Sequence, residues 1–105
     1  MRNYRTLQEV SEEYFKEHPD EIEDFLKIAF ETYAEDGDSE ALLSELRVIA
    51  RVKGISAIAN EIGMSRQGLQ RALSAKGNPR LDNITAIMQA MGYHLVPQKM
   101  DLSAV

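Results

Sequence analysis

The sequence predicts an all-helical protein that ends in one short β-strand, and two observations lead to this prediction. Apolar residues recur at three- and four-residue steps through most of the 105 residues, which is the spacing of amphipathic helices. Alternation of apolar and polar residues, which is typical of a strand, is confined to residues 93–96. A chain of this length forms one domain of modest size with little surplus core.

The first two helices are expected on either side of residue 19. A repeat at helical spacing predicts the first helix, and its members are Leu7, Val10 and Tyr14. His18-Pro19 stops this segment, and Pro19 also suits the first turn of a second helix over residues 20–36. Acidic residues at the start of that helix favour its positive end. The apolar stripe of the second helix consists of Ile22, Phe25, Leu26, Ala29, Phe30 and Tyr33.

A third helix is expected between two breaks in the pattern. Residues 36–39, Asp-Gly-Asp-Ser, end the second helix, and either Asp38 or Ser39 is the expected N-cap of the third. Gly54 ends this helix. Its inward side is lined by Leu42, Leu43, Leu46, Ile49 and Ala50.

Residues 55–74 have the pattern of a helix-turn-helix. Ala59 is small enough for two helices to approach closely, and Gly63 allows the left-handed turn between them. Ser65 is the expected N-cap of the second helix. The inward side chains are Ile58, Ile62, Met64, Leu69 and Ala72. An ordinary helical hairpin with a polar outer face is the alternative, and we favour the helix-turn-helix because several constraints are met within twenty residues.

The C-terminal part contains a turn, a last helix and the strand. Residues 76–79 form the turn, and residues 82–91 form a helix whose inward side chains are Ile84, Ile87, Met88 and Met91. The strand at 93–96 ends at Pro97. Because a lone strand leaves its backbone groups unpaired, we expect it to pair with a second copy of the chain or with a partner's sheet edge. We therefore divide the chain into an acidic helical extension (1–37), a helix-turn-helix domain (38–97) and a flexible tail (98–105).

The charge is distributed very unevenly along the chain. The whole carries a formal net charge of −5, but residues 1–45 hold 14 acidic and 4 basic residues, whereas residues 46–105 hold 3 acidic and 8 basic ones. The basic half contains the predicted helix-turn-helix, which favours a nucleic-acid partner. The acidic half suits a basic protein partner, and a solvated helix face is the alternative. The candidates for a phosphate footprint are Arg47, Arg51, Lys53, Arg66, Arg71, Lys76 and Arg80.

Individual roles on DNA follow from side-chain chemistry. Gln67 and Gln70 can pair with adenine, and Arg71 can fork onto guanine, so these three are the expected base contacts. The expected phosphate contacts are Ser65, Arg66, Lys76, Asn78 and Arg80. The residues expected to fix the motif itself are Ala59, Gly63 and Leu69. Since a module of this size seldom binds specifically alone, we expect a homodimer on a palindrome with half-sites about 10 bp apart.

Other classes of function have little support in the sequence. The chain has no cysteine, no apolar run long enough to span a bilayer and no secretory signal, so we expect a cytoplasmic protein. His18 and His94 lie far apart, and a calcium loop starting at Asp36 would have Arg47 where a glutamate is required. We expect no catalytic residue, no metal and no cofactor. The aromatic side chains are assigned to the core, and these are Tyr14, Phe15, Phe25, Phe30 and Tyr33.

From Asp38 onward the chain resembles the addiction-module antidote proteins, which are HigA-type antitoxins of the lambda-repressor-like (Xre) helix-turn-helix superfamily. The resemblance rests on Gly37-Asp38, IARVKG (49–54), Ser56, Ile58-Ala59, GMSRQGL (63–69), ALS (72–74), GNPR (77–80), Met88 and AMG (90–92). It covers about the last two-thirds of the chain. Two residues depart from the pattern: Gln70 replaces a frequent aromatic residue and Lys76 a usual acidic one. Both bear on the operator sequence rather than on the fold.

The resemblance implies a lambda-repressor-like five-helix domain and a type II antitoxin. Such a protein neutralises a small basic toxin, similar to mRNA endonucleases, and represses its own operon. The toxin is expected to dock on the acidic helix 20–36 or, as a second choice, on the strand 93–96. The alternative function is a plain dimeric transcriptional repressor without a toxin partner. A weaker one, an adaptor that has lost DNA binding, is disfavoured by the polar face at residues 66–71.

Overall fold

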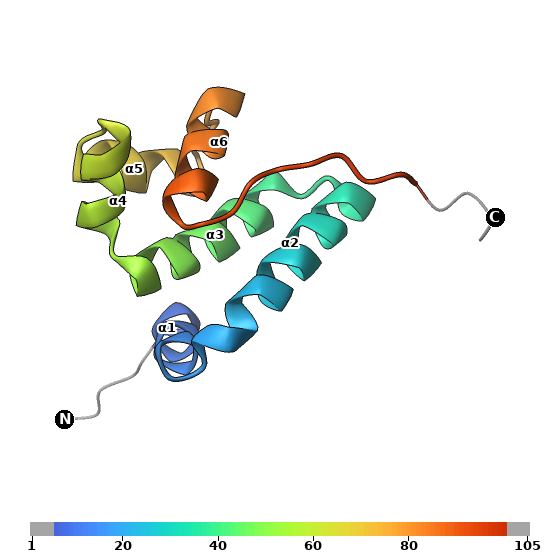
Figure 1. The fold of residues 1–105 in the computed structure, drawn as a ribbon, viewed down its shortest axis with the longest axis horizontal. Coiled ribbons are helices and arrows are strands. Elements are labelled where there is room, and N and C mark those ends of the chain that lie inside the picture. Colours follow the sequence, from blue (N-terminus) through green and yellow to red (C-terminus); the bar gives the residue numbers. More distant parts are fainter. Residues whose placement is uncertain (1–5, 101–105) are drawn as a thin grey trace.

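The computed structural model of the chain describes residues 6–100, and within this range every regular element is a helix (Figure 1). The elements are α1 (Leu7–Glu17), the short 3-10 turn η1 (Pro19–Glu21), α2 (Ile22–Asp36), α3 (Ser39–Lys53), α4 (Ile55–Ile62), α5 (Arg66–Ala72) and α6 (Leu81–Ala90). The all-helical class predicted from the sequence is therefore confirmed. Residues 1–5 of the expected extension and residues 101–105 of the expected tail lie outside the described range.

Local chemistry explains where the N-terminal helices begin and end. The Thr6 hydroxyl accepts a hydrogen bond from the Glu9 N–H at 3.1 Å, which caps α1. Pro19 opens η1 rather than α2 itself, and η1 leads directly into α2. The α2 helix ends at Gly37, whose φ of 68° lies in the left-handed region. Asp38, one of the two expected caps, accepts from the Ala41 N–H at 3.1 Å and caps α3.

The central element of the fold is α3. Both α1 and α2 pack against it, and so does α4, which in turn contacts α5 and α6. In Figure 1 the first two helices and the α4–α6 group lie on different sides of α3. The largest fully buried side chains come from α3, from the segment 66–73 and from α6, and they are Leu46, Ile49, Leu69, Leu73 and Ile87. One continuous core thus connects the N-terminal helices to the C-terminal ones.

Two aromatic residues assigned to the core lie on the surface instead. Tyr14 is 44% exposed and Tyr33 is 39% exposed, whereas Phe15 is the buried residue of α1. Tyr14 stacks on His18 at a ring distance of 4.2 Å and donates a hydrogen bond to Glu21 at 2.6 Å. Helical periodicity identifies an apolar stripe on a helix but does not indicate which other helix covers it. In α1 the core residue is Phe15, and not the stripe that includes Tyr14.

The strand expected at 93–96 is absent from the described part of the chain. After α6 the backbone continues without regular structure, and it runs as an extended coil in Figure 1. The physical reason is that no other extended segment among residues 6–100 lies beside it to complete a hydrogen-bonded ladder. Pairing with another molecule remains a prediction, and so does the division of the chain at residues 37 and 98.

Candidate nucleic-acid interface

The turn between α4 and α5 has the backbone geometry that the sequence predicts. Gly63 ends α4 with a φ of 75°, a left-handed conformation that costs glycine little. The Met64 N–H donates to the Ala59 carbonyl at 2.9 Å, which closes the end of α4. Ala59 is buried at this point. Three residues therefore reverse the chain between two short helices that contact each other, which we call the α4–α5 pair.

The start of α5 is fixed by a side-chain cap. The Ser65 hydroxyl accepts a hydrogen bond from the Gly68 N–H at 2.9 Å, so the N-cap predicted from the sequence is confirmed. A Cβ atom at Gly68 would lie only 2.9 Å from this same hydroxyl oxygen. The close contact explains why a glycine, a poor helix former, occupies the middle of a seven-residue helix.

The two sides of α5 differ sharply in polarity. Leu69 is fully buried, and so is Leu73 at the C-cap, a core residue that the sequence analysis missed although it follows Leu69 by four positions. Arg66, Gln67 and Arg71 are exposed, and Gln70 is half-buried. Within residues 6–100 no hydrogen bond or ion pair engages the side chains of Arg66, Gln67 or Arg71. The helix therefore offers its polar side to solvent or to a ligand.

The turn after α5 folds back onto the end of that helix. The Gly77 N–H donates to the Ser74 carbonyl at 2.8 Å, and the Ser74 hydroxyl donates to the Arg71 carbonyl at 2.8 Å. A Cβ atom at Gly77 would collide with the backbone carbonyl of Ala72, so only glycine fits there. This close approach holds Lys76 and Asn78, both exposed, next to the C-terminal end of α5.

Arg80 lies at the far end of this turn, where it is the N-cap residue of α6. Its Nε atom is 3.4 Å from a carboxylate oxygen of Asp82, and both side chains are largely exposed. An exposed ion pair of this kind is worth little, so a phosphate can compete for the arginine.

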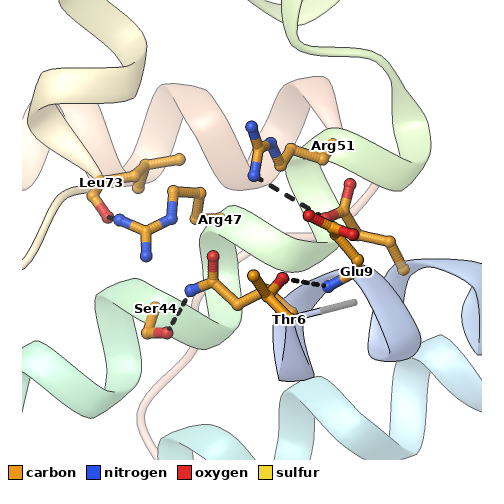
Figure 2. A network of polar contacts seen from close by, with 8 residues as sticks. Thr6, Glu9, Ser44, Arg47, Arg51 and Leu73 are labelled. Atoms are coloured by element: carbon orange, nitrogen blue, oxygen red, sulfur yellow. Dashed lines mark hydrogen bonds and ion pairs between the residues drawn. The ribbon is translucent and has the colours of Figure 1, made fainter. Parts of the chain in front are cut away.

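Three of the basic residues predicted to contact phosphates interact with other parts of the protein instead. Arg47 donates to the Leu73 carbonyl at 3.2 Å, and Arg51 lies 3.7 Å from a carboxylate oxygen of Glu12 in α1 (Figure 2). Lys53 lies over the Tyr93 ring at 5.7 Å. These side chains connect α3 to α1, to the end of α5 and to the segment after α6. The other four candidates for the phosphate footprint all lie on α5 or in the turn that follows it, up to the N-cap of α6.

Metal-binding clusters, membrane-spanning helices and the contacts of His18 are the other features of the described residues that bear on function. Residues 6–100 contain no cluster of three or more His, Cys, Asp or Glu side chains that could hold a metal ion. None of their helices is both long and apolar enough to cross a membrane. His18 contacts the Tyr14 carbonyl at 2.8 Å through Nδ1, so it takes part in the junction between α1 and η1.

The fold and this surface thus define an all-helical protein whose α4–α5 pair presents a polar, basic side. Residues 7–99 match the model of a family described as "Probable addiction module antidote protein". Because the match covers most of the chain, the protein belongs to this family of antidotes, which are the antitoxins of addiction modules.

Relatives add little to this assignment. Over 77 residues the chain is 32% identical to an uncharacterized protein of Haemophilus influenzae (strain ATCC 51907 / DSM 11121 / KW20 / Rd). The aligned region spans 73% of this chain and 79% of that protein. No solved structure matches the chain.

Proposed function

We propose that this antidote protein is a HigA-type, DNA-binding antitoxin with a lambda-repressor-like (Xre) helix-turn-helix domain. In this proposal it neutralises a small basic toxin similar to mRNA endonucleases and represses its own operon from the cytoplasm. It acts by binding alone, without catalysis or a cofactor. The family supports the antitoxin role. The α4–α5 pair supports the DNA-binding role.

The observation that favours DNA binding most is the contrast between the two sides of α5. Leu69 is fully buried and fixes the inner side of the helix, while Arg66, Gln67 and Arg71 are exposed and have no side-chain partner among the described residues. A recognition helix needs this combination, because its backbone must be fixed while its donors and acceptors remain available for base edges.

The contacts divide into two kinds. Gln67, Gln70 and Arg71 are the proposed base contacts, since amide and guanidinium groups read adenine and guanine in the major groove. Ser65 and Arg66 are proposed phosphate contacts at the N-terminal end of α5. The turn after α5 supplies the remaining proposed phosphate contacts, which are Lys76, Asn78 and Arg80.

We further propose that two copies bind one palindromic operator. One α5 helix contacts only a few base pairs, and two copies on half-sites about one helical turn apart supply the missing specificity. A titration of purified protein against labelled DNA from immediately upstream of its gene, with scrambled DNA of the same length, tests this function across a salt series. The double variant Gln67→Ala/Arg71→Ala removes the proposed base contacts. Its matched control is Lys16→Ala in α1, which also removes one positive charge.

The proposal expects tight, salt-sensitive binding that prefers the native sequence. The double variant loses that preference and Lys16→Ala keeps it. Equal, weak binding of both DNAs by the wild-type protein would contradict the DNA-binding role. A plain repressor is the other candidate, because it would use the same α5 surface. The antitoxin proposal expects a basic protein to be encoded beside this gene, and co-purification with that protein separates the two functions. A plain repressor binds DNA but does not bind that protein, whereas an antitoxin binds both.

A further inference from the structure

A groove runs between α2 and the chain segment that follows α6. The residues lining it come from α2, from the end of α6 and from the segment after it, and they are Glu23, Leu26, Lys27, Phe30, Glu31, Ala34, Met88, Gln89, Gly92, Tyr93, His94, Leu95, Val96 and Gln98. From the sequence, helix 20–36 and residues 93–96 are predicted as two alternative docking sites for a toxin. In the structure these two regions form the two walls of a single groove.

One wall of the groove is an extended segment whose backbone is available for pairing. The Tyr93 N–H donates to the Met88 carbonyl at 2.9 Å, but no backbone hydrogen bond joins residues 94–100 to any other described residue. Tyr93 itself is held in place, because Lys53 lies over its ring at 5.7 Å. Leu95 and Val96 are exposed apolar side chains, at 38% and 69%. Unpaired backbone beside exposed apolar side chains is what an added strand requires.

The other wall is acidic. Glu23 and Glu31 line the groove from α2, and so does Lys27, which pairs with Glu23 at 3.5 Å; His94 lines it from the segment after α6. Burial and, to a smaller extent, the charge of Glu23 raise the pKa of Tyr93, which is consistent with Glu23 facing the segment after α6 across the groove. A second copy of this chain would bring another acidic α2 helix toward these carboxylates, whereas a cationic partner would be attracted to them.

We propose that this groove is where the toxin docks, through an extended, basic segment that pairs with residues 94–96. The backbone of that segment completes the ladder that the chain lacks on its own, and its cationic side chains lie against Glu23 and Glu31. This inference rests on the proposed antitoxin function. No residue of α5 lines the groove, so the surface assigned to DNA remains available while the groove is occupied.

Two pairs of variants of the full chain test the two walls separately. Glu31→Lys reverses a charge in the groove, and Glu17→Lys makes the same charge change on α1, outside the groove. Leu95→Pro and Val96→Pro each remove one backbone N–H, with Leu95→Ala and Val96→Ala as controls for the side chains. Both proline positions are needed because successive N–H groups of an extended chain point to opposite sides, so only one of the two faces the partner.

The antitoxin proposal expects a toxin-sized reading frame that encodes a basic protein beside this gene, and that protein is the probe, titrated at low and high salt. We expect Glu31→Lys to weaken binding about five- to tenfold at low salt and less at high salt, while Glu17→Lys stays within about twofold of wild type. At least one proline variant should weaken binding about tenfold relative to its alanine control. The melting temperatures of the free variants should match wild type, since none of these side chains is buried.

The outcomes distinguish this inference from the function on which it rests. If the wild-type chain does not bind the basic protein, the proposed antitoxin function fails. If it binds and the variants bind equally well, the toxin docks elsewhere and only the inference is overturned. If Glu31→Lys weakens binding but neither proline variant does, backbone pairing is overturned. If a proline variant weakens binding but Glu31→Lys does not, the role of charge is overturned. Loss of self-association in the proline variants, measured by sedimentation, would show that a second copy occupies the groove.

Discussion

Replacing Arg47 by methionine tests whether this residue stabilises the fold or binds DNA. Arg47 lies in α3, and its Nη1 atom donates to the Leu73 carbonyl 3.2 Å away, at the end of α5 (Figure 2). Methionine keeps an apolar chain of similar reach but cannot donate this hydrogen bond. The Leu73 carbonyl then loses its donor in a part of the protein where the Leu73 side chain is fully buried.

The expected cost follows from the kind of hydrogen bond that is lost. A hydrogen bond from a charged donor contributes about 1.5–3 kcal/mol, and the partial exposure of Arg47 reduces the expected contribution of this one to about 1–2 kcal/mol. In a protein of this size such a loss lowers the melting temperature by about 5–10 °C. Arg66→Met is the matched control, because Arg66 is exposed and its replacement should change the unfolding free energy by less than about 0.5 kcal/mol.

Urea unfolding and DNA binding across a salt series together separate the two roles. Arg47→Met should be less stable than wild type and leave the slope of log K against log salt unchanged. Arg66→Met should be as stable as wild type and reduce that slope by about one unit. If Arg47→Met instead leaves the unfolding free energy unchanged and reduces the slope, Arg47 contacts a phosphate and the reasoning from its hydrogen bond is wrong.

Three further predictions concern the same core and its surroundings. Gly63→Ala should lower the free energy of unfolding by about 1 kcal/mol, because alanine is strained in the left-handed conformation of this residue. Gly77→Ala should lower it by at least about 2 kcal/mol, because the added Cβ would collide with backbone atoms. Equal losses in urea unfolding would contradict this difference. Ser65→Ala should cost about 1 kcal/mol by removing the cap of α5, and Ser65→Thr should restore most of it; a stable Ser65→Ala protein would argue against the cap. Burial, and then the charges of two nearby aspartates, raise the pKa of Glu45. The folded state therefore holds this proton more tightly, so stability falls as pH rises through the interval between the unfolded and folded pKa. Glu45→Gln should consequently raise the melting temperature at pH 7, and the gain should vanish below the ordinary pKa of glutamate; a gain that is the same at both pH values would show another cause.

Features that depend on neighbouring residues could be predicted from the sequence. A cap needs only a side chain and an N–H three residues away, so Ser65 was identifiable as a cap and Asp38 as one of two candidates, the other being Ser39. The left-handed turn at Gly63 and the breaks at Pro19 and Gly54 depend on equally local chemistry.

Features that depend on distant contacts could not be predicted in the same way. Arg47 reaches a carbonyl 26 positions away, and no local pattern distinguishes it from Arg71, which faces solvent. For the same reason the periodicity of α1 indicated Tyr14 as a core residue, whereas its neighbour Phe15 is the one buried. The charge asymmetry therefore identified the basic half of the chain, but it could not show which of the basic side chains there contact other parts of the protein.

The most direct test of the central claim, that α5 reads DNA bases, is the affinity of wild type, Arg71→Ala and Arg80→Ala for a panel of single-base-pair variants of the upstream DNA. The account predicts that Arg71→Ala loses about 1–3 kcal/mol and stops discriminating at one position of the site. Arg80→Ala should weaken binding to every sequence alike and reduce the salt slope. If both variants weaken every sequence equally, Arg71 does not read a base, and the assignment of α5 as the recognition helix is contradicted.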